Sequence, residues 1–76
     1  MPQSAKLFSE RLNRCLDDTD APAVMRERTA ILSKLIDIPK QLAWSLLEGH
    51  QFPDQSTLLK IASEFEVDPK WLSGEI

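Results

Sequence analysis

The sequence has 76 residues, of which 42% are hydrophobic, and its formal net charge is −3 at pH 7. This size allows one small domain with a modest core, and the composition is that of a globular chain rather than a disordered one. There is no apolar run of the roughly 20 residues that span a membrane, no signal-peptide pattern at the N-terminus, and a single cysteine, Cys15, that cannot form an internal disulfide. These features predict a cytoplasmic protein.

The first predicted helix covers residues 4–16. Its apolar residues recur at three- and four-residue steps and form one stripe: Ala5, Phe8, Leu12, Cys15 and Leu16. Cys15 is interpreted as a small buried hydrophobic residue of this stripe. The segment DDTDAP should end the helix, because its acids lie at the unfavourable end of the helix dipole and Pro22 cannot continue the helix.

The next two predicted helices cover residues 25–35 and 39–47 and are joined by a short turn. In the earlier helix, the residues expected to face the core are Ile31, Leu32, Leu35 and Ile36. Pro39 suits the first turn of the later helix, where its missing N–H costs nothing. Gly49 is expected to cap the C-terminal end of that helix.

The helix over residues 39–47 has two contrasting faces at 100° per residue. Its inner face is apolar and consists of Leu42, Ala43, Leu46 and Leu47. Its outer face is mostly polar and consists of Lys40, Gln41, Trp44, Ser45 and Glu48. Such a helix packs with one side and offers the other to a ligand or to solvent.

Two further helices are predicted over residues 55–65 and 69–73. Asp54 should cap the first of them, whose apolar stripe is Leu58, Ile61, Ala62 and Phe65. Asp68 should cap the second, with Pro69 in its first position and Trp71 and Leu72 turned inward. No segment shows convincing period-two alternation, so we expect an all-α fold: a compact bundle of about five helices in one domain over residues 1–76.

Two helices joined by a turn of about four residues, the second with a polar outer face, describe a helix-turn-helix. The stretch ILSKLIDIPKQLAWSLLEGHQFPDQSTLLKIASEFEVDPKWLSGE (31–75) resembles the lambda-repressor-like family of phage repressors, Cro-type proteins and small bacterial regulators. The resemblance lies in Ile38 in the turn, Gly49 at the end of the third helix and Pro53 four residues later. FSERL (8–12) resembles the usual opening of the family, and TLLKIASEFEVDPKWL (57–72) resembles its last two helices.

The resemblance implies that the third helix enters the major groove of DNA, that the second lies across the backbone, and that a homodimer binds a two-fold operator. Carried over by position, base edges or adjacent phosphates would be contacted by Lys40, Gln41, Trp44 and Ser45. The residues expected to contact phosphate are Arg26, Arg28, Thr29 and His50. The predicted function is therefore a sequence-specific transcription regulator, a repressor of the Cro type.

Three of the four candidate base contacts on the third helix also have plainer interpretations. The amide of Gln41 can pair with adenine N6 and N7, or it can be one polar group on a solvated face. Lys40 can bind a phosphate or a guanine, or remain solvated. Trp44 can fold over the edge of the core and compensate for the small Ala43, or contact a thymine methyl group or a protein partner.

The candidate phosphate contacts are open to the same kind of alternative. Arg26 and Arg28 can clamp phosphate with their planar guanidinium groups, or form salt bridges with nearby acids: Asp17, Asp18, Asp20 or Glu27. His50 can meet a phosphate or the backbone. A metal site at His50 is not expected, because no cysteine or second histidine accompanies it.

The chain departs from the family pattern at several positions. The connection DDTDAPAVMRER between the first two helices is longer than usual. Ser33 stands where the family usually has alanine, Pro39 replaces a typical serine cap, and Ala43 is smaller than the usual branched residue. These departures bear on the contacts more than on the fold.

The charge distribution favours a rival function. Residues 1–38 contain six basic and six acidic residues, whereas residues 39–76 contain three lysines and six acids. DNA-binding surfaces are usually basic, because phosphate contacts supply much of the affinity. The rival is a helix-turn-helix kept as a protein-interaction module, antitoxin-like or anti-repressor, with Trp44 and the acidic C-terminal half as its surface. Nothing in the sequence indicates an enzyme or a cofactor.

Overall fold

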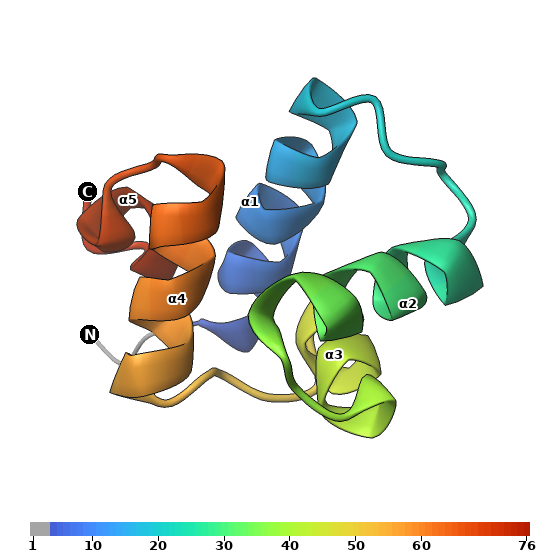
Figure 1. The fold of residues 1–76 in the computed structure, drawn as a ribbon. Helices are drawn as coiled ribbons and strands as arrows, with labels where there is room; N and C mark the ends of the chain where they lie inside the picture. The colour runs from blue at the N-terminus through green and yellow to red at the C-terminus, as the bar shows by residue number, and fades with distance from the viewer. Residues whose placement is uncertain (1–3) are drawn as a thin grey trace.

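The computed structural model describes residues 4–76; residues 1–3 of the predicted domain lie outside this range. The described residues form five helices and no strand (Figure 1): α1 (Ala5–Asp18), α2 (Met25–Ile36), α3 (Lys40–Leu47), α4 (Gln55–Phe65) and α5 (Pro69–Ser73). The predicted all-α bundle of about five helices is therefore confirmed. Each helix begins and ends within two residues of its predicted bounds.

Side-chain caps fix the beginnings of three helices. Ser4 accepts a hydrogen bond from the Leu7 N–H at the start of α1, and the predicted caps Asp54 and Asp68 accept from the N–H groups of Thr57 and Lys70. These bonds satisfy backbone donors that have no partner within the helix. Pro69 opens α5 as predicted, whereas Pro39 precedes the first residue of α3 as an extended N-cap.

Helix α1 continues two residues past its predicted end at residue 16. Asp17 and Asp18 lie in its last turn, where the helix dipole disfavours acids. The guanidinium of Arg28 pairs with the Asp17 carboxylate and offsets this cost. The Thr19 hydroxyl then donates to the Leu16 carbonyl, and the chain turns away from the helix.

The core gathers apolar residues from all five helices: Phe8, Leu12, Leu16, Leu32, Ile36, Ala43, Leu46, Leu47, Leu58, Ile61, Ala62 and Leu72. The inner face predicted for α3 is confirmed. Cys15 is buried as well. The pKa of its thiol is raised, chiefly because burial disfavours the thiolate and secondly because the Asp18 carboxylate lies nearby. The core position predicted for Leu35 is wrong, because Leu32 and Ile36 take the inward side of α2 and leave Leu35 41% exposed.

Helices α2 and α3 pack against each other, and α3 also packs against α1. Helices α4 and α5 pack against each other on the other side of α1, at the end of the molecule where the C-terminus lies (Figure 1). None of the helices in residues 4–76 combines the length and apolar character needed to cross a membrane.

The turn between α2 and α3 is closed by Ser33. Asp37 adopts a left-handed conformation with φ of 57°, which lets the Ile38 N–H donate to the Ser33 carbonyl at 3.0 Å. The Ser33 hydroxyl donates in turn to the Ile38 carbonyl. The Ser33 hydroxyl therefore stabilises the turn that leads into α3.

Candidate nucleic-acid interface

The outer face of α3 is open to solvent. Lys40, Gln41 and Trp44 are exposed and Ser45 is partly buried, while the inner residues of α3 hold the helix against the core. Gln41 and Ser45 line a shallow hollow of about 320 Å³ together with Pro39 and Gln51. The structure thus brings the four predicted base-contacting residues onto one accessible helix.

Trp44 lies at the surface rather than in the core. It is 44% exposed, and its ring stacks on the His50 ring with centroids 4.9 Å apart and planes 22° from parallel. Gly49 makes this possible: its φ of 78° reverses the chain, and the His50 N–H donates to the Ser45 carbonyl at 2.9 Å. The C-terminal cap of α3 therefore positions the His50 ring against the Trp44 ring.

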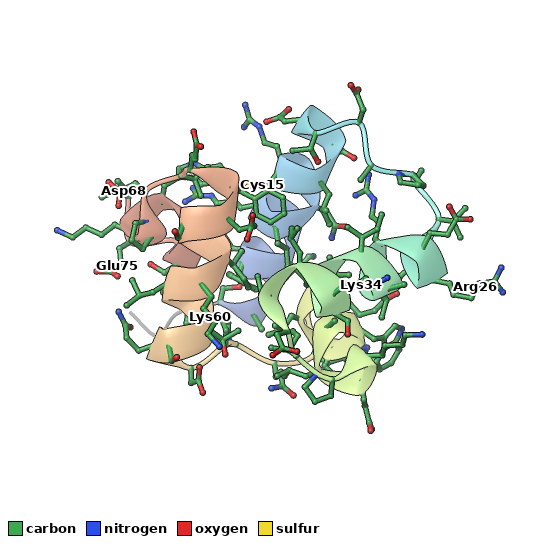
Figure 2. All side chains as sticks on the ribbon, viewed as in Figure 1. Cys15, Arg26, Lys34, Lys60, Asp68 and Glu75 are labelled. Carbon is green, nitrogen blue, oxygen red and sulfur yellow. The ribbon has the colours of Figure 1, made fainter. Side chains whose placement is uncertain are left out.

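A groove of about 410 Å³ runs between the start of α2 and the outer edge of α3. Its apolar lining comes from Met25, Ala30 and Trp44, and its cations are Arg26 and Lys40. In Figure 2, the Arg26 side chain extends away from the body of the protein at the N-terminal end of α2. Arg26 is therefore placed where a ligand bound along α3 can reach its guanidinium.

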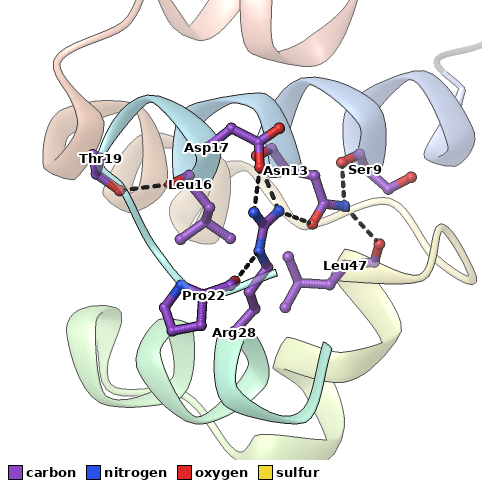
Figure 3. Close-up of polar contacts among 8 residues, drawn as sticks. All are labelled: Ser9, Asn13, Leu16, Asp17, Thr19, Pro22, Arg28 and Leu47. Atoms are coloured by element: carbon purple, nitrogen blue, oxygen red, sulfur yellow. Dashed lines mark hydrogen bonds and ion pairs between the residues drawn. The ribbon is translucent and has the colours of Figure 1, made fainter. Parts of the chain in front are cut away.

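Arg28 faces inward, in contrast to Arg26 (Figure 3). It is only 6% exposed. Its Nε donates to the Pro22 carbonyl at 2.6 Å, its Nη1 donates to the backbone and side-chain oxygens of Asn13 at 3.2 and 3.0 Å, and its Nη2 pairs with the Asp17 carboxylate. The phosphate contact predicted for Arg28 does not fit this placement, and the alternative, a salt bridge with Asp17, is the one that the structure contains.

Asn13 extends the hydrogen bonds of Arg28 to α3. Its Nδ2 donates to the Ser9 carbonyl at 2.9 Å and to the carbonyl of Leu47, the last residue of α3, at 3.1 Å. We call Asn13, Asp17 and Arg28 the arginine clamp. Asn13 lies outside the apolar stripe of α1, so periodicity gives no indication of this role, although Asn13 and Asp17 are four residues apart and so share one face of α1.

Thr29 is largely buried at the start of α2. It is 8% exposed, and its Oγ1 is buried with no hydrogen-bond partner among residues 4–76. Thr29 nevertheless lines the floor of the groove between α2 and α3, so its predicted phosphate contact stays a prediction. Of the four predicted phosphate contacts, Arg26 and His50 remain exposed.

Charge on this face is sparse. Arg26 and Lys40 are the cations that line the groove beside α3, and Glu48 lines the same groove. Across residues 4–76, the pair of Arg28 with Asp17 is the one salt bridge within 4 Å, so it is the arginine clamp, rather than the groove, that holds paired charge. Within the same residues no three histidine, cysteine or acidic side chains gather closely enough to hold a metal ion.

Comparison of the chain with protein-family models, with curated proteins and with solved structures gives no match in any of the three.

Proposed function

We propose that the protein is a sequence-specific DNA-binding transcription regulator that acts in the cytoplasm and inserts α3 into the major groove. The observation that carries this proposal is the accessible row of Lys40, Gln41, Trp44 and Ser45 on a short helix that follows α2 after a tight turn. The resemblance of residues 31–75 to lambda-repressor-like domains supports it. In that arrangement α2 crosses the DNA backbone and α3 reads base edges.

Gln41 is the principal reader of bases in this proposal. It is exposed, lies in the first turn of α3, and carries an amide that can donate to adenine N7 and accept from adenine N6. Lys40 beside it supplies a charge for a phosphate or a guanine. Trp44, one helical turn further along, presents an apolar edge to a thymine methyl group.

The register on DNA would be set by few charges. Arg26 and Lys40 flank the groove beside α3, and the exposed His50 adds a hydrogen-bonding group at the other end of the helix. Each phosphate that is neutralised contributes about −0.9 to the slope of log K against log salt concentration. Two cations per copy give a slope of about −2, which is shallow for a DNA-binding protein.

A direct test is selection from randomised duplex DNA with the wild-type protein and with Gln41→Ala. The wild type should enrich one motif, and Gln41→Ala should lose preference at one position of each half-site, worth about 1–3 kcal/mol. Gln55→Ala is the matched control, since Gln55 is exposed at the start of α4. An unchanged motif with Gln41→Ala would remove Gln41 from base recognition.

A second candidate function is recognition of a protein partner through the same face. It is favoured by the exposed stack of Trp44 on His50, because exposed tryptophans often anchor protein interfaces. The net charge of −3 also favours it. The two functions differ in one measurable respect: a protein-interaction module would not bind DNA even at low salt, where phosphate contacts are strongest.

A further inference from the structure

The groove between the start of α2 and the outer edge of α3 has the size of a small-molecule site. Its volume of about 410 Å³ lies within the range of roughly 300–1,000 Å³ that is usual for such sites. Seven residues line it, whereas a stable protein interface takes about 20–30 residues from each partner. The groove by itself therefore suits a small molecule better than a folded protein.

Apolar side chains from both helices line the groove. Met25 and Ala30 come from α2, and Trp44 comes from α3. Met25 packs against the core and the His50 ring stacks on Trp44, so both side chains are held in place by the protein itself. Aromatic rings stack on one another, and methionine sulfur packs well against their edges. A flat aromatic molecule would find both kinds of contact in this groove.

The charged side chains of the groove favour a ligand with one negative charge. Arg26 and Lys40 are cations and Glu48 is an acid, so the lining carries a net charge of +1. Neither cation forms a salt bridge within 4 Å inside residues 4–76. A carboxylate would pair with these cations, whereas Glu48 would repel a second negative charge on the same molecule.

Thr29 adds an unpartnered hydroxyl to the floor of the groove. Its Oγ1 is buried and has no hydrogen-bond partner among residues 4–76. Thr29 follows Arg26 by three residues, so the two side chains share one face of α2. A buried hydroxyl without a partner costs free energy, which a ligand oxygen that accepts its hydrogen bond would recover. The floor beside Arg26 is therefore the place where a carboxylate fits best.

We propose that this groove binds a planar aromatic molecule with a single carboxylate, and that the bound molecule displaces DNA. The carboxylate accepts hydrogen bonds from Arg26, Lys40 and Thr29, and the aromatic ring packs on Trp44. The displacement rests on the proposed function, because Lys40 and Trp44 are also proposed base contacts. The molecule is then an effector that releases the regulator from its operator.

The test is isothermal titration calorimetry of the full chain, without DNA, against three probes. The first is 2-naphthoate, which has both the ring and the carboxylate. The second is 2-naphthamide, which has the same ring and no charge, and the third is inorganic phosphate, which has charge and no ring. We expect 2-naphthoate to saturate one site per chain and the other two to bind at least about tenfold more weakly. No saturable binding of 2-naphthoate at millimolar concentrations, or equal affinity for 2-naphthamide, would overturn the proposal.

Substitutions locate the probe in the groove. Arg26→Met should weaken the binding of 2-naphthoate about tenfold, because a charge-assisted hydrogen bond is lost. Lys60→Met is the matched control: it removes an exposed cation that does not line this groove, and it should bind as the wild type does. Equal affinities of these two variants would overturn the proposal.

Thr29→Val separates binding from stability. Valine keeps the shape of threonine and removes the unpartnered hydroxyl, so the melting temperature of the free protein should be unchanged or higher. Its affinity for 2-naphthoate should nevertheless fall about threefold to tenfold. Wild-type affinity in Thr29→Val would contradict the proposed position of the carboxylate.

The failure of the effector site and the failure of DNA binding give different results. If both hold, 2-naphthoate should lower the occupancy of the selected duplex as its concentration rises, and an unchanged occupancy would overturn the displacement. A protein that binds DNA but not 2-naphthoate keeps the proposed function and loses the effector site. A protein that binds 2-naphthoate in the groove but no DNA keeps the ligand site and loses the regulator.

Discussion

Arg26 and Arg28 stand two positions apart at the start of α2 and have opposite environments. Arg26 is exposed beside the groove along α3, whereas Arg28 is buried in the arginine clamp, where all of its guanidinium nitrogens are used. A helix turns about 200° over two residues, so side chains spaced in this way face opposite sides. The two arginines therefore have separate roles, one on the surface and one in the fold.

We predict that Arg28→Met destabilises the protein by about 2–4 kcal/mol. The substitution leaves the oxygens of Asn13, Asp17 and Pro22 without the guanidinium donor, and some of these oxygens are partly buried. The Asp17 side chain is 63% exposed and can hydrate, which keeps the loss below that of a fully buried pair. Arg26→Met is the control and should change stability by about 0.5 kcal/mol or less. Urea denaturation measures both, and equal midpoints would contradict the role assigned to the clamp.

Trp44 should contribute more to binding than to folding. Because it is 44% exposed, Trp44→Ala should cost about 1–2 kcal/mol of stability, less than the roughly 2–5 kcal/mol expected for the buried Leu46→Ala. The same substitution should weaken binding to the selected DNA motif. Thermal or urea unfolding of the two variants gives the comparison, and a larger loss for Trp44→Ala than for Leu46→Ala would assign Trp44 to the core.

At the scale of the elements, α3 is short and depends on its ends. It has eight residues, no side-chain cap at its start and a glycine-dependent cap at its end. The Ser33 hydroxyl closes the turn before it, and Asn13 donates to its last carbonyl. The contacts that orient α3 therefore come from α1 and α2 rather than from α3 itself.

Gly49→Ala should destabilise the end of α3 by about 1–2 kcal/mol, since left-handed backbone disfavours a Cβ. The added Cβ would also lie 3.0 Å from the Ser9 Oγ. Gly49→Asn should lose less than alanine does, because asparagine tolerates this conformation better. Urea denaturation gives the free energy of unfolding of the wild type, Gly49→Asn and Gly49→Ala, which should decrease in that order. An alanine variant as stable as the wild type would contradict the requirement for glycine.

Helix α4 gives a prediction that depends on pH. Hydrogen bonds from Thr57 lower the pKa of the Asp54 carboxyl below its usual value. The stabilisation from this cap is therefore complete above the usual pKa and is lost as the pH falls through the lowered pKa. Unfolding measured from pH 6 to pH 2 should show a smaller acid-induced loss in Asp54→Asn than in the wild type. An identical pH dependence would contradict the role of the Asp54 charge.

For the molecule as a whole, local signals in the sequence were enough to locate the helices. Caps such as Asp54 and Asp68, and the apolar stripes, are local properties, so they identify where helices begin and which face is buried. The environment of Leu35 depends on how much of α2 the neighbouring helices cover. The burial of Arg28 depends on Asn13, which lies 15 residues earlier on α1, and on the path of the connection that brings the Pro22 carbonyl to its guanidinium. Such tertiary contacts cannot be read from periodicity.

The measurement that bears most directly on the proposed regulator is a titration of the wild-type protein against genomic and random duplex fragments at low and moderate salt. We expect enrichment of a two-fold motif, with affinity that falls as salt rises with a slope of about −2 per copy. Absence of binding even at low salt would contradict DNA recognition, and Trp44 with its neighbouring groove would then be the surface on which to seek a protein partner.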